Sequence, residues 1–377
     1  MFPHLNCLPV GRHVSLFTLS AALLCACTTI QPPADGLVVA DHLNGPQGVY
    51  VKTDGTLLIT DTGTGGTLGT FTTPGGPGSP VPESNTYGNT ATIVEISTTG
   101  ARTVLASLPS VAGKTETSGA GRVTELNGRV YATTGHWSAG ASIGQLSHIA
   151  VLVQLGPGTV SDLANLWTFE ATNDPDKQGA DSHPYALVAG PDGNLWMTDA
   201  GGNDLLRVNP TTGAVSLVTV FANLPNANPA AGTPPTSQAV PTGVAFLNDG
   251  GAYVSLLPGF PFVPGASKVV RVAGDGSQTD YATGLSATTD LRTGPDGNLY
   301  AVELGRFGAQ GPLPGTGSIV RIRAGGVKET VLSGLNTPTS IAFNTLGDAF
   351  VTVNGAAAPG TGQVLRWDRL TSRRALQ

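Results

Sequence analysis

Hydrophobic and polar positions along the chain follow one order that recurs. In its clearest copy, an apolar run after His183 leads to the turn Asp192-Gly193 and to a second apolar run that ends at Asp199. Two more short apolar segments follow, at residues 205–208 and 215–221. Short apolar runs joined by an Asp-Gly turn are typical of antiparallel β-hairpins. The pattern therefore predicts four strands that pair in chain order.

This unit occurs six times along the sequence. Its turns are centred on Asp54, Asn127, Asp192, Asp249, Asp296 and Leu346, which lie 47 to 73 residues apart. The four-stranded blades of a β-propeller repeat about every 40–50 residues, and Gly- and Pro-rich insertions account for the wider spacings. We therefore expect an all-β protein, a six-bladed β-propeller of four-stranded blades over residues 36–368. A β-sandwich or β-solenoid with similar turns is the alternative.

The last copy of the unit is one strand short. It lacks a fourth strand after Trp367, whereas the apolar run Gly36 to Ala40 precedes the first copy without a partner. This amino-terminal strand would complete the last blade and cover the open edge that an unclosed sheet exposes. We expect residues 36–40 to close the ring in this way, and residues 369–377 to form a carboxy-terminal tail.

Residues 1–26 have the features of an export signal. Arg12 precedes an apolar run over residues 14–25, which is short for a membrane-spanning helix and suits a signal-peptide core. The run ends in Leu24-Cys25-Ala26-Cys27, which resembles the lipobox of bacterial lipoproteins. We expect cleavage before Cys27, lipidation of Cys27 and a linker over residues 27–35. Secretion with cleavage near Ala26 is the alternative.

The lipobox resemblance implies an extracytoplasmic location. Residue Thr28 is not the Asp that is associated with inner-membrane retention. We therefore expect an outer-membrane or cell-surface lipoprotein, or otherwise a periplasmic or secreted protein. The membrane is contacted only through the amino-terminal lipid anchor.

The composition of the chain limits the kinds of partner that it can bind and the chemistry that it can perform. Charged residues make up 12% of the chain, the net charge is −6, and no basic cluster occurs before Arg373-Arg374. A nucleic-acid partner is therefore disfavoured. All three cysteines fall within the first 27 residues, which excludes a thiolate nucleophile, a Cys-ligated zinc and disulfides from the rest of the chain.

Several longer stretches resemble a known family. The repeats are similar to NHL-type propellers, and four stretches resemble more specifically the ScyD/ScyE family of secreted bacterial proteins. The stretches are Glu170–Asp176 with Asp181–Tyr185, Asp199–Val208, Gly259–Ala266 ahead of Val270–Val272, and Tyr281–Leu285. The resemblance implies an NHL-like six-bladed propeller outside the cytoplasm, without an established activity.

Antiparallel pairing of the first two strands of each blade predicts where polar residues gather. The start of the first strand lines up with the end of the second, so residues at these positions meet at one mouth of the central channel. We expect the ligand-binding side chains there. They are Asp61, Asp181, His183, Asp199, Asn203, Asp204, Asp290, Glu303 and Asn354.

Carboxylates that share one mouth repel each other unless a cation or a donor-rich ligand compensates them. Oxygen ligands without cysteine suit Ca²⁺ or Mg²⁺ better than Zn²⁺. Asp199, Asp290 and Glu303 are then the candidate metal ligands, with Ca²⁺ as the candidate cofactor. The alternative is that these acids cap turns and bind backbone amides within their own blades.

Two loops and one histidine allow more than one interpretation. Residues 174–181 carry alternating acids and a glycine at the sixth position, as in a calcium loop, but the terminal Glu of such a loop is missing. The loop 256–262 presents two aromatic residues beside prolines, and it either forms an apolar contact surface or plugs one end of the channel. His183 is either a general base or a packed residue next to Pro184.

We expect a monomeric binding module for a small molecule, a glycan or an envelope protein at the channel mouth. The alternative is a metal-dependent hydrolase of lactones or esters on an NHL-like propeller, in which a cation polarises the carbonyl and a carboxylate activates water. Carboxylate oxygens within one coordination sphere would favour the enzyme. Acids that are each bonded to their own turn would favour the binding module.

Overall fold

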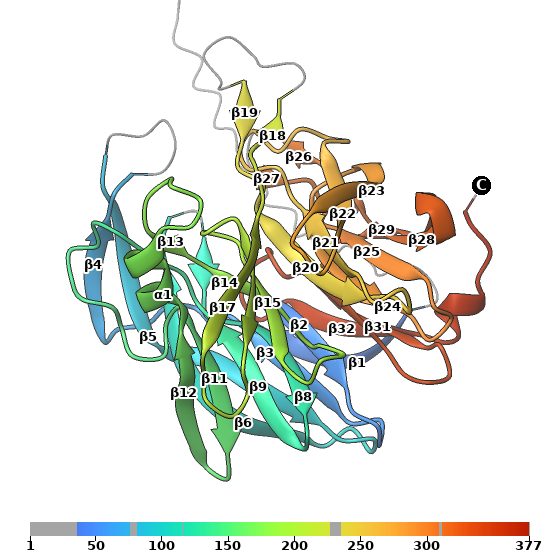
Figure 1. Cartoon of the computed structure of the whole chain (residues 1–377). Helices are drawn as coiled ribbons and strands as arrows, with labels where there is room; N and C mark the ends of the chain where they lie inside the picture. The colour runs from blue at the N-terminus through green and yellow to red at the C-terminus, as the bar shows by residue number, and fades with distance from the viewer. Residues whose placement is uncertain (1–35, 76–80, 115, 227–234, 309–310, 377) are drawn as a thin grey trace, which may run out of the picture. The chain divides into compact units, whose positions relative to one another are not determined.

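The computed structural model describes residues 36–75, 81–114, 116–226, 235–308 and 311–376 (Figure 1). The expected signal segment 1–26, the lipidation site Cys27 and the linker 27–35 lie outside the described residues. No helix within the described ranges is both long enough and apolar enough to cross a membrane.

Six sheets of four or more strands, numbered here as blades 1 to 6 in chain order, make up most of the described part of the chain. Blade 1 contains β2 (Pro46–Val51), β3 (Leu57–Asp61), β5 (Glu83–Ile96), β6 (Arg102–Ala112) and β7 (Thr117–Ser118), with β4 (Gly69–Thr73) on β5. Blade 2 contains β8 (Ala120–Leu126), β9 (Arg129–Thr134), β11 (Val151–Gly156) and β12 (Thr159–Asn165). Blade 3 contains β14 (Pro184–Ala189), β15 (Leu195–Asp199), β16 (Asp204–Val208) and β17 (Val215–Val220).

The second half of the ring repeats this order. Blade 4 contains β20 (Pro241–Phe246), β21 (Ala252–Leu256), β22 (Ser267–Val272) and β23 (Gln278–Leu285). Blade 5 contains β24 (Thr288–Thr293), β25 (Leu299–Glu303), β28 (Gly317–Arg323) and β29 (Val327–Leu335). Blade 6 contains β30 (Ser340–Phe343), β31 (Ala349–Val353), β32 (Gly362–Trp367) and β1 (Leu37–Leu43).

Shorter elements lie in the loops between these strands. Three two-stranded pairs are β10 (Trp137–Ser138) with β13 (Asp181–Ser182), β18 (Leu224–Pro225) with β19 (Thr236–Ser237), and β26 (Phe307–Gly308) with β27 (Gly311–Pro312). The helical segments are α1 (Leu166–Asn173), η1 (Ala324–Gly326) and η2 (Leu370–Ser372).

The hairpin turns form as their sequence predicts. In blade 3, Gly193 has a φ of +76°, a conformation that glycine adopts without steric cost. The preceding Asp192 accepts a hydrogen bond on Oδ1 from the backbone N–H of Asn194 (3.1 Å). Asp54, Asp249 and Asp296 accept the equivalent bond in their own turns. Each Asp-Gly pair therefore fixes the register of its hairpin locally.

Apolar side chains fill the space between neighbouring sheets all the way round the ring. One buried cluster joins blades 2 and 3 through Leu152 and Leu187, and equivalent clusters join each later pair of neighbours. Blades 1 and 2 share a further cluster, and blades 6 and 1 share another that includes Leu57 and Val364. The last sheet therefore packs on the first, and the prediction of an all-β, six-bladed propeller is confirmed.

The amino-terminal strand β1 is the outermost strand of blade 6. It runs antiparallel to β32, with Leu37 opposite Arg366 and Leu43 opposite Gly362, and the two ends of the colour scale meet there (Figure 1). Gly36 lies against the indole of Trp367, where an added Cβ would come within 2.7 Å of the ring. A side chain at residue 36 would therefore displace this buried tryptophan.

Residues beyond Trp367 pack onto the propeller. Leu370 is fully buried in the core shared by blades 5 and 6. Arg321 of β28 donates hydrogen bonds to the carbonyls of Thr371 (2.9 Å) and Arg373 (3.0 Å). The described part of the expected tail is thus held against blade 5.

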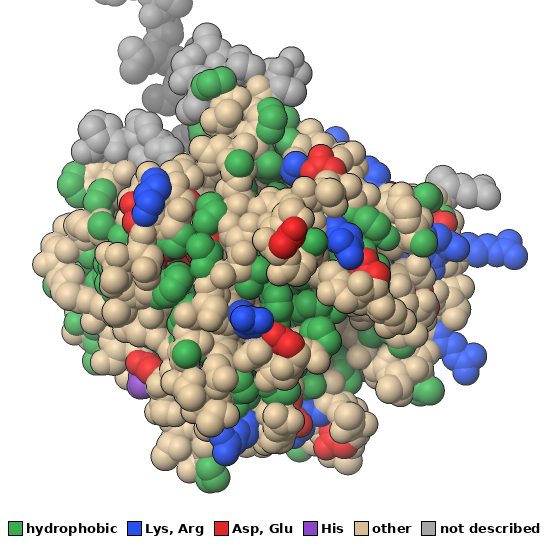
Figure 2. All heavy atoms as spheres, in the orientation of Figure 1, with side chains coloured by type: hydrophobic (Ala, Val, Ile, Leu, Met, Phe, Trp, Pro, Cys, Tyr) green, Lys and Arg blue, Asp and Glu red, His purple; other side chains and the backbone are tan. Residues whose placement is uncertain are grey.

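The surface carries few charges, in line with the composition. Figure 2 shows single basic and acidic side chains scattered among polar and apolar ones on the face in view. No broad basic area is visible on that face, which fits the absence of a basic cluster from the sequence.

Candidate functional site

The strand pairings bring the predicted positions to one end of each blade. The start of the first strand faces the end of the second in three blades, where Pro46 pairs with Asp61, Pro184 with Asp199, and Thr288 with Glu303. These acids therefore lie where the first strand begins, as the antiparallel geometry requires.

In all three blades, the acid at the end of the second strand accepts a hydrogen bond from a backbone N–H just before the first strand. Asp61 accepts a hydrogen bond from the backbone N–H of Asn44 (2.8 Å), and Glu303 accepts one from Ser286 N–H (2.7 Å). Asp199 likewise accepts one from His183 N–H (2.6 Å). Each carboxylate thus fixes the loop that leads into its own blade, which is the turn-forming role.

Asp199 is the most fully bonded of these acids. Its second oxygen accepts from Ser182 Oγ (2.6 Å), and the amides of Gly201 and Gly202 donate to the first at 3.1 and 3.2 Å. Burial raises the pKa of Asp199 to about 6, although the hydrogen bonds from Ser182, His183 and Gly202 oppose this shift. Its oxygens are therefore occupied by protein donors.

Asp290 lies inside the channel, next to Arg122. Both side chains are fully buried, and Arg122 Nε is 3.9 Å from Asp290 Oδ2. Asp290 also accepts hydrogen bonds from Ser340 Oγ (2.7 Å) and from its neighbour Leu291 N–H (2.9 Å), and Arg292 Nε lies 3.2 Å from Oδ1. Two arginines of the propeller, Arg122 and Arg292, therefore balance the negative charge of Asp290.

Arg122 joins several blades across the channel. It donates to the carbonyls of Thr289 (2.6 Å) and Thr339 (2.8 Å) and to that of Gln47, and its guanidinium lies 4.6 Å from the centre of the Tyr185 ring. Its partners come from blades 1, 3, 5 and from the residue before blade 6. The side chain therefore fills and crosslinks the channel interior.

The structure does not bring the three candidate metal ligands together. Asp199, Asp290 and Glu303 each have donors of their own, and Glu303 accepts from Ser318 Oγ (2.5 Å) in addition to Ser286 N–H. Asn354 is bonded to Asn336 and to the Thr361 carbonyl (2.7 Å) within blade 6. Among the described residues, the group of acids close enough to share a cation is a different one, Glu170, Asp174 and Asp176.

A cavity of about 690 Å³ opens beside the predicted mouth and is called the mouth pocket below. Its walls come from the extended β4–β5 hairpin of blade 1, from β10 between the second and third strands of blade 2, from the loop before blade 3 and from Phe262 after β21. The polar groups that face it include Glu83, Glu116, His136 and Asp181.

A histidine and a carboxylate form the polar centre of the mouth pocket. His136 Nε2 lies 2.7 Å from Asp181 Oδ1, and both side chains are partly exposed. Desolvation opposes protonation of His136, but the hydrogen bond to Asp181 and the charges of Asp181, Glu116 and Asp199 raise its pKa to about 9. Burial by itself would raise the pKa of Asp181. The hydrogen bond with His136 and the charges of His136 and His183 outweigh this effect and hold the pKa of Asp181 below its ordinary value.

His183 supports this pair and does not face the cavity directly. Its ring centre is 5.5 Å from that of His136 and 5.6 Å from that of Tyr185. Burial lowers the pKa of His183, and the nearby charges of Glu116 and Asp181 act in the opposite direction. The His183 ring packs between His136 and the Tyr185 ring that covers Arg122.

Aromatic side chains line part of the mouth pocket. Phe71 and Trp137 are buried, with ring centres 5.2 Å apart, and both line the cavity. Phe262 stacks on Phe307 (4.4 Å, 17°), while Phe260 is 58% exposed. The loop 256–262 therefore contributes an apolar surface beside the pocket, as one of its two expected roles requires.

Sequence reasoning missed His136, although a signal for it existed. It lies two residues after β9, which is the second, tyrosine-containing strand of blade 2. The rule that selected Asp61 and Asp199 therefore applied to it as well. Glu170 carried no such signal, because the helix α1 that holds it interrupts the repeat.

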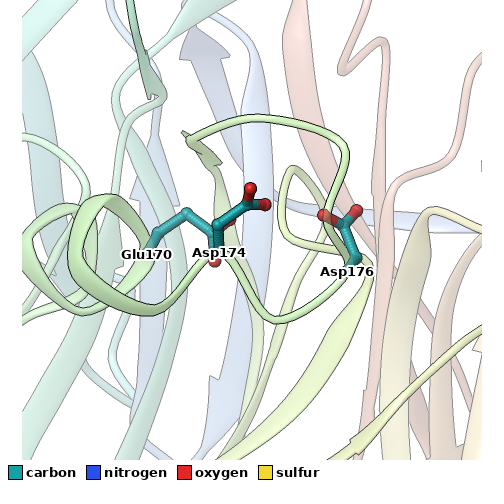
Figure 3. Close-up of side chains that lie close together, drawn as sticks. All are labelled: Glu170, Asp174 and Asp176. Carbon is teal, nitrogen blue, oxygen red and sulfur yellow. The ribbon is translucent and has the colours of Figure 1, made fainter.

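A second polar cluster lies next to the mouth pocket. Glu170 begins the last turn of α1, Asp174 follows the helix, and Asp176 lies on the next loop (Figure 3). Burial raises the pKa of Glu170 to about 8, and the charges of Asp199, Asp176, Asp174 and Asp181 add to the shift. Burial likewise raises the pKa of Asp204, with the charges of Asp199, Glu170 and Asp176 adding to it.

Asn203 links Asp176 of the second polar cluster to the backbone at Val240. Its amide nitrogen donates to Asp176 Oδ2 (2.8 Å), and its carbonyl oxygen accepts from Val240 N–H (3.1 Å). Asn203 therefore positions Asp176 and has no oxygen directed into the mouth pocket. A different cavity of about 480 Å³, lined mainly by apolar side chains with Glu125 and Arg292, involves residues at the far ends of the inner strands.

Comparison with known proteins supports the fold. No protein-family model matches the chain, and no curated protein matches it. The gluconolactonase from Xanthomonas campestris is 13% identical with a TM-score of 0.52, over 88% of this chain and 88% of that one. A protein of unknown function from Bacteroides thetaiotaomicron VPI-5482 is 13% identical with a TM-score of 0.52, over 89% and 72%.

A third structure is the PQQ-bound aldose sugar dehydrogenase from Streptomyces coelicolor. It is 15% identical with a TM-score of 0.50, over 90% of this chain and 99% of that one. Likeness at such low identity concerns the fold and not the chemistry. The chain therefore has a β-propeller fold similar to that of these proteins.

Proposed function

We propose that this protein binds a neutral, hydroxyl-rich small molecule, such as a sugar or a sugar lactone, in the mouth pocket. The observation that carries the proposal is the His136–Asp181 pair, which faces a cavity of about 690 Å³ beside aromatic side chains. Ligand pockets usually have volumes of about 300–1,000 Å³, with a few polar groups that orient the ligand. The proposal includes that the protein is a member of the ScyD/ScyE family of secreted propellers, which its sequence resembles.

The charges that line the pocket favour a neutral ligand over an anion. Glu83, Glu116 and Asp181 are carboxylates, whereas His136 is the cation that faces them. Glu83 Oε1 already accepts from the backbone N–H of Lys114 (2.5 Å). The remaining carboxylate oxygens can accept hydrogen bonds from hydroxyl groups, and their net negative charge repels a carboxylate or phosphate ligand.

The aromatic side chains of the pocket favour a ligand with a ring. Trp137, Phe71 and Phe262 line the cavity together with the charged groups. The C–H face of a pyranose or lactone ring packs against aromatic side chains, while its hydroxyl groups remain free to bond polar ones. A pocket lined by both aromatic and carboxylate side chains matches such an amphipathic ring.

The test is a titration with three series of probes. Neutral monosaccharides and glucono-1,5-lactone are compared with gluconate and with glucosamine by saturation-transfer NMR and calorimetry. We expect saturable binding of neutral probes and none of gluconate. His136→Gln and Asp181→Asn should each weaken binding by about tenfold, the cost of one charge-assisted hydrogen bond.

A matched control is available on the same blade. His148 Nδ1 lies 2.5 Å from Asp162 Oδ1, so this pair resembles His136–Asp181 but does not line the mouth pocket. His148→Gln should bind the neutral probes as the wild type does. Failure of every neutral probe to bind, or equal losses in the two histidine variants, would rule out the proposal.

A lactone or ester hydrolase is the second candidate. The observation that favours it is the same His136, because a protonated imidazole beside a cavity can donate to a carbonyl oxygen or to a leaving group. Release of acid from glucono-1,5-lactone, measured above the spontaneous rate with Ca²⁺ and with a chelator, tests it. Turnover that disappears in His136→Gln would favour the enzyme, and binding without turnover would favour the binding module.

A further inference from the structure

We infer that a divalent cation, Ca²⁺ in preference to Mg²⁺, binds between helix α1 and the loop 174–181, with Glu170, Asp174 and Asp176 as its carboxylate ligands. This cation site is separate from the candidate ligands Asp199, Asp290 and Glu303 and goes beyond the proposed ligand binding.

The spacing of the three carboxylates suits a calcium ion. One oxygen from each residue lies within 4.8 Å of one oxygen from each of the others. Ligand oxygens surround Ca²⁺ at about 2.3–2.6 Å, so opposite ligands are separated by about 4.6–5.2 Å. Figure 3 shows the carboxylates approaching from the helix, from its end and from the following loop.

Two buried side chains at this cluster have carboxylate oxygens without a hydrogen-bond partner. Glu170 is 1% exposed and its Oε1 has no hydrogen-bond partner, and Asp204 is fully buried with neither oxygen bonded. A buried carboxylate without a partner is costly, and removal of both its water and its donors is rare in native proteins. The unpartnered oxygen of Glu170 therefore indicates a positive group beside this side chain, and Asp204 adds a second uncompensated carboxyl group nearby.

Several acids lie close to Glu170. The charges of Asp174, Asp176, Asp181 and Asp199 act on its carboxylate, and Asp204 interacts with it as well. The cation of the same loop, Lys177, donates to the Asn173 carbonyl (2.8 Å) instead. A bound divalent cation would compensate the cluster that this lysine leaves uncompensated.

Hydrogen bonds from the backbone and from the Asn203 side chain hold two of the ligands in place. Asp174 follows the helix with a φ of +39°, and its Oδ1 accepts from Gly179 N–H (3.2 Å). Asp176 accepts from Gln178 N–H (2.9 Å) and from the amide of Asn203 (2.8 Å). An added Cβ on Gly202 would come within 2.8 Å of Glu170 Oε2, so the glycine leaves room for this carboxylate.

The ligand set favours Ca²⁺ among the common cations. All three ligands are carboxylates, with no histidine or cysteine, which selects hard cations over Zn²⁺. Asp174 and Asp176 are partly exposed, so water can fill the remaining positions. Ca²⁺ accepts an irregular shell of six to eight oxygens, whereas Mg²⁺ requires a near-ideal octahedron at shorter distances.

The test measures cation binding directly and needs no sugar ligand. Purified protein is stripped with a chelator and titrated with Ca²⁺ and with Mg²⁺ by calorimetry. We expect one Ca²⁺ site with a Kd below about 1 mM and at least about tenfold weaker Mg²⁺ binding. Tb³⁺ provides a second readout, because Trp167 lies one helical turn before Glu170 and can sensitise its emission.

Two variants and a control make the site assignable. Glu170→Gln and Asp174→Asn should each weaken Ca²⁺ binding by about tenfold or more. The second keeps Oδ1 for Gly179 N–H, so it preserves the loop if Glu170→Gln misfolds. Asp280→Asn removes an exposed acid paired with Lys268 elsewhere and should bind Ca²⁺ as the wild type does.

Two results would overturn the inference. One is the absence of saturable Ca²⁺ heat and of Tb³⁺ emission in the wild type. The other is an unchanged Ca²⁺ affinity in both folded variants. Because sugar binding is measured in a different titration at the mouth pocket, failure of the proposed function and failure of the cation site are distinguishable.

Discussion

Three carboxylates that end the second strands, Asp61, Asp199 and Glu303, have the same structural role. Each accepts a hydrogen bond from a backbone N–H one or two residues before the first strand of its blade. Repetition of an acid at equivalent positions therefore reflects a repeated turn here. The pattern alone could not distinguish this role from metal binding, because both place an oxygen at the same mouth.

Arg122 is the residue whose loss should destabilise the propeller most directly. In Arg122→Met, the carbonyls of Thr289 and Thr339 lose their hydrogen-bond donor. Asp290 also loses the ion pair that it forms with this arginine. Breaking a buried charge pair costs about 3–5 kcal/mol. We expect a decrease of that size in the free energy of unfolding, measured by urea denaturation.

The double variant provides the control for this prediction. Arg122→Met combined with Asp290→Asn removes both charges, so it should lose less stability than the sum of the two single variants. Additive losses would show that the two side chains do not interact, contrary to their 3.9 Å separation.

The His136–Asp181 pair predicts a defined pH dependence of stability. The folded pKa of His136 is raised to about 9, above its ordinary 6.5. Its contribution is therefore complete below about pH 6.5 and is lost as the pH rises through about 9. The lowered pKa of Asp181 has the opposite consequence, and its contribution is lost as the pH falls through its folded pKa, below the ordinary 3.8.

Urea unfolding at pH 6, 7.5 and 9.5 tests this dependence. We expect wild-type stability to fall over this range and the fall to be smaller in His136→Gln. Glu170, with a pKa raised to about 8, adds to the wild-type fall with the same sign, so the difference between the two proteins is the informative quantity. Equal slopes would contradict the prediction.

At the scale of elements, local hairpins were predictable and inserted segments were not. The Asp-Gly turns and their flanking apolar runs specify β14–β15 and β24–β25 through interactions a few residues apart. In contrast, the β10–β13 pair joins residues between two strands of blade 2 to residues just before blade 3, far along the chain. The helix α1 lies between blades 2 and 3, outside the repeated unit. The mouth pocket is lined by such segments. Of the nine residues predicted at the channel mouth, only Asp181 lines it, together with Phe262 of the predicted aromatic loop, whereas His136, Phe71 and Trp137 were not predicted.

The strand β1 offers a test of its place in blade 6. Leu43 is fully buried in the core between blades 6 and 1, whereas Leu37 of the same strand is 61% exposed. Leu43→Ala should lower the free energy of unfolding by about 2–5 kcal/mol, the usual cost of a large core truncation. Leu37→Ala is the matched control and should change it by less than about 0.5 kcal/mol.

Thermal and urea unfolding of the two variants check this prediction. Similar small losses in both would mean that β1 is not part of the cooperative fold. An equally large loss in Leu37→Ala would mean that its exposed side chain supports a contact beyond the strand pairing.

At the scale of the molecule, the ring was predictable because one unit recurs six times. A blade cannot bury both of its faces alone, so neighbouring copies must stack, and the described part of the chain shows a core between each neighbouring pair. The candidate sites were less predictable. They depend on departures from the repeat, namely the long β4–β5 hairpin, the helix α1 and the acidic loop after it.

The pairing of β1 with β32 has a consequence for biogenesis. The ribosome makes Leu37 long before Arg366, yet these two residues are opposite each other in the finished sheet. The strand β1 must therefore wait for β32 before blade 6 is complete. Contacts between such distant residues form slowly. Synthesis of β32, and not of any earlier blade, thus sets the earliest moment at which the ring can close.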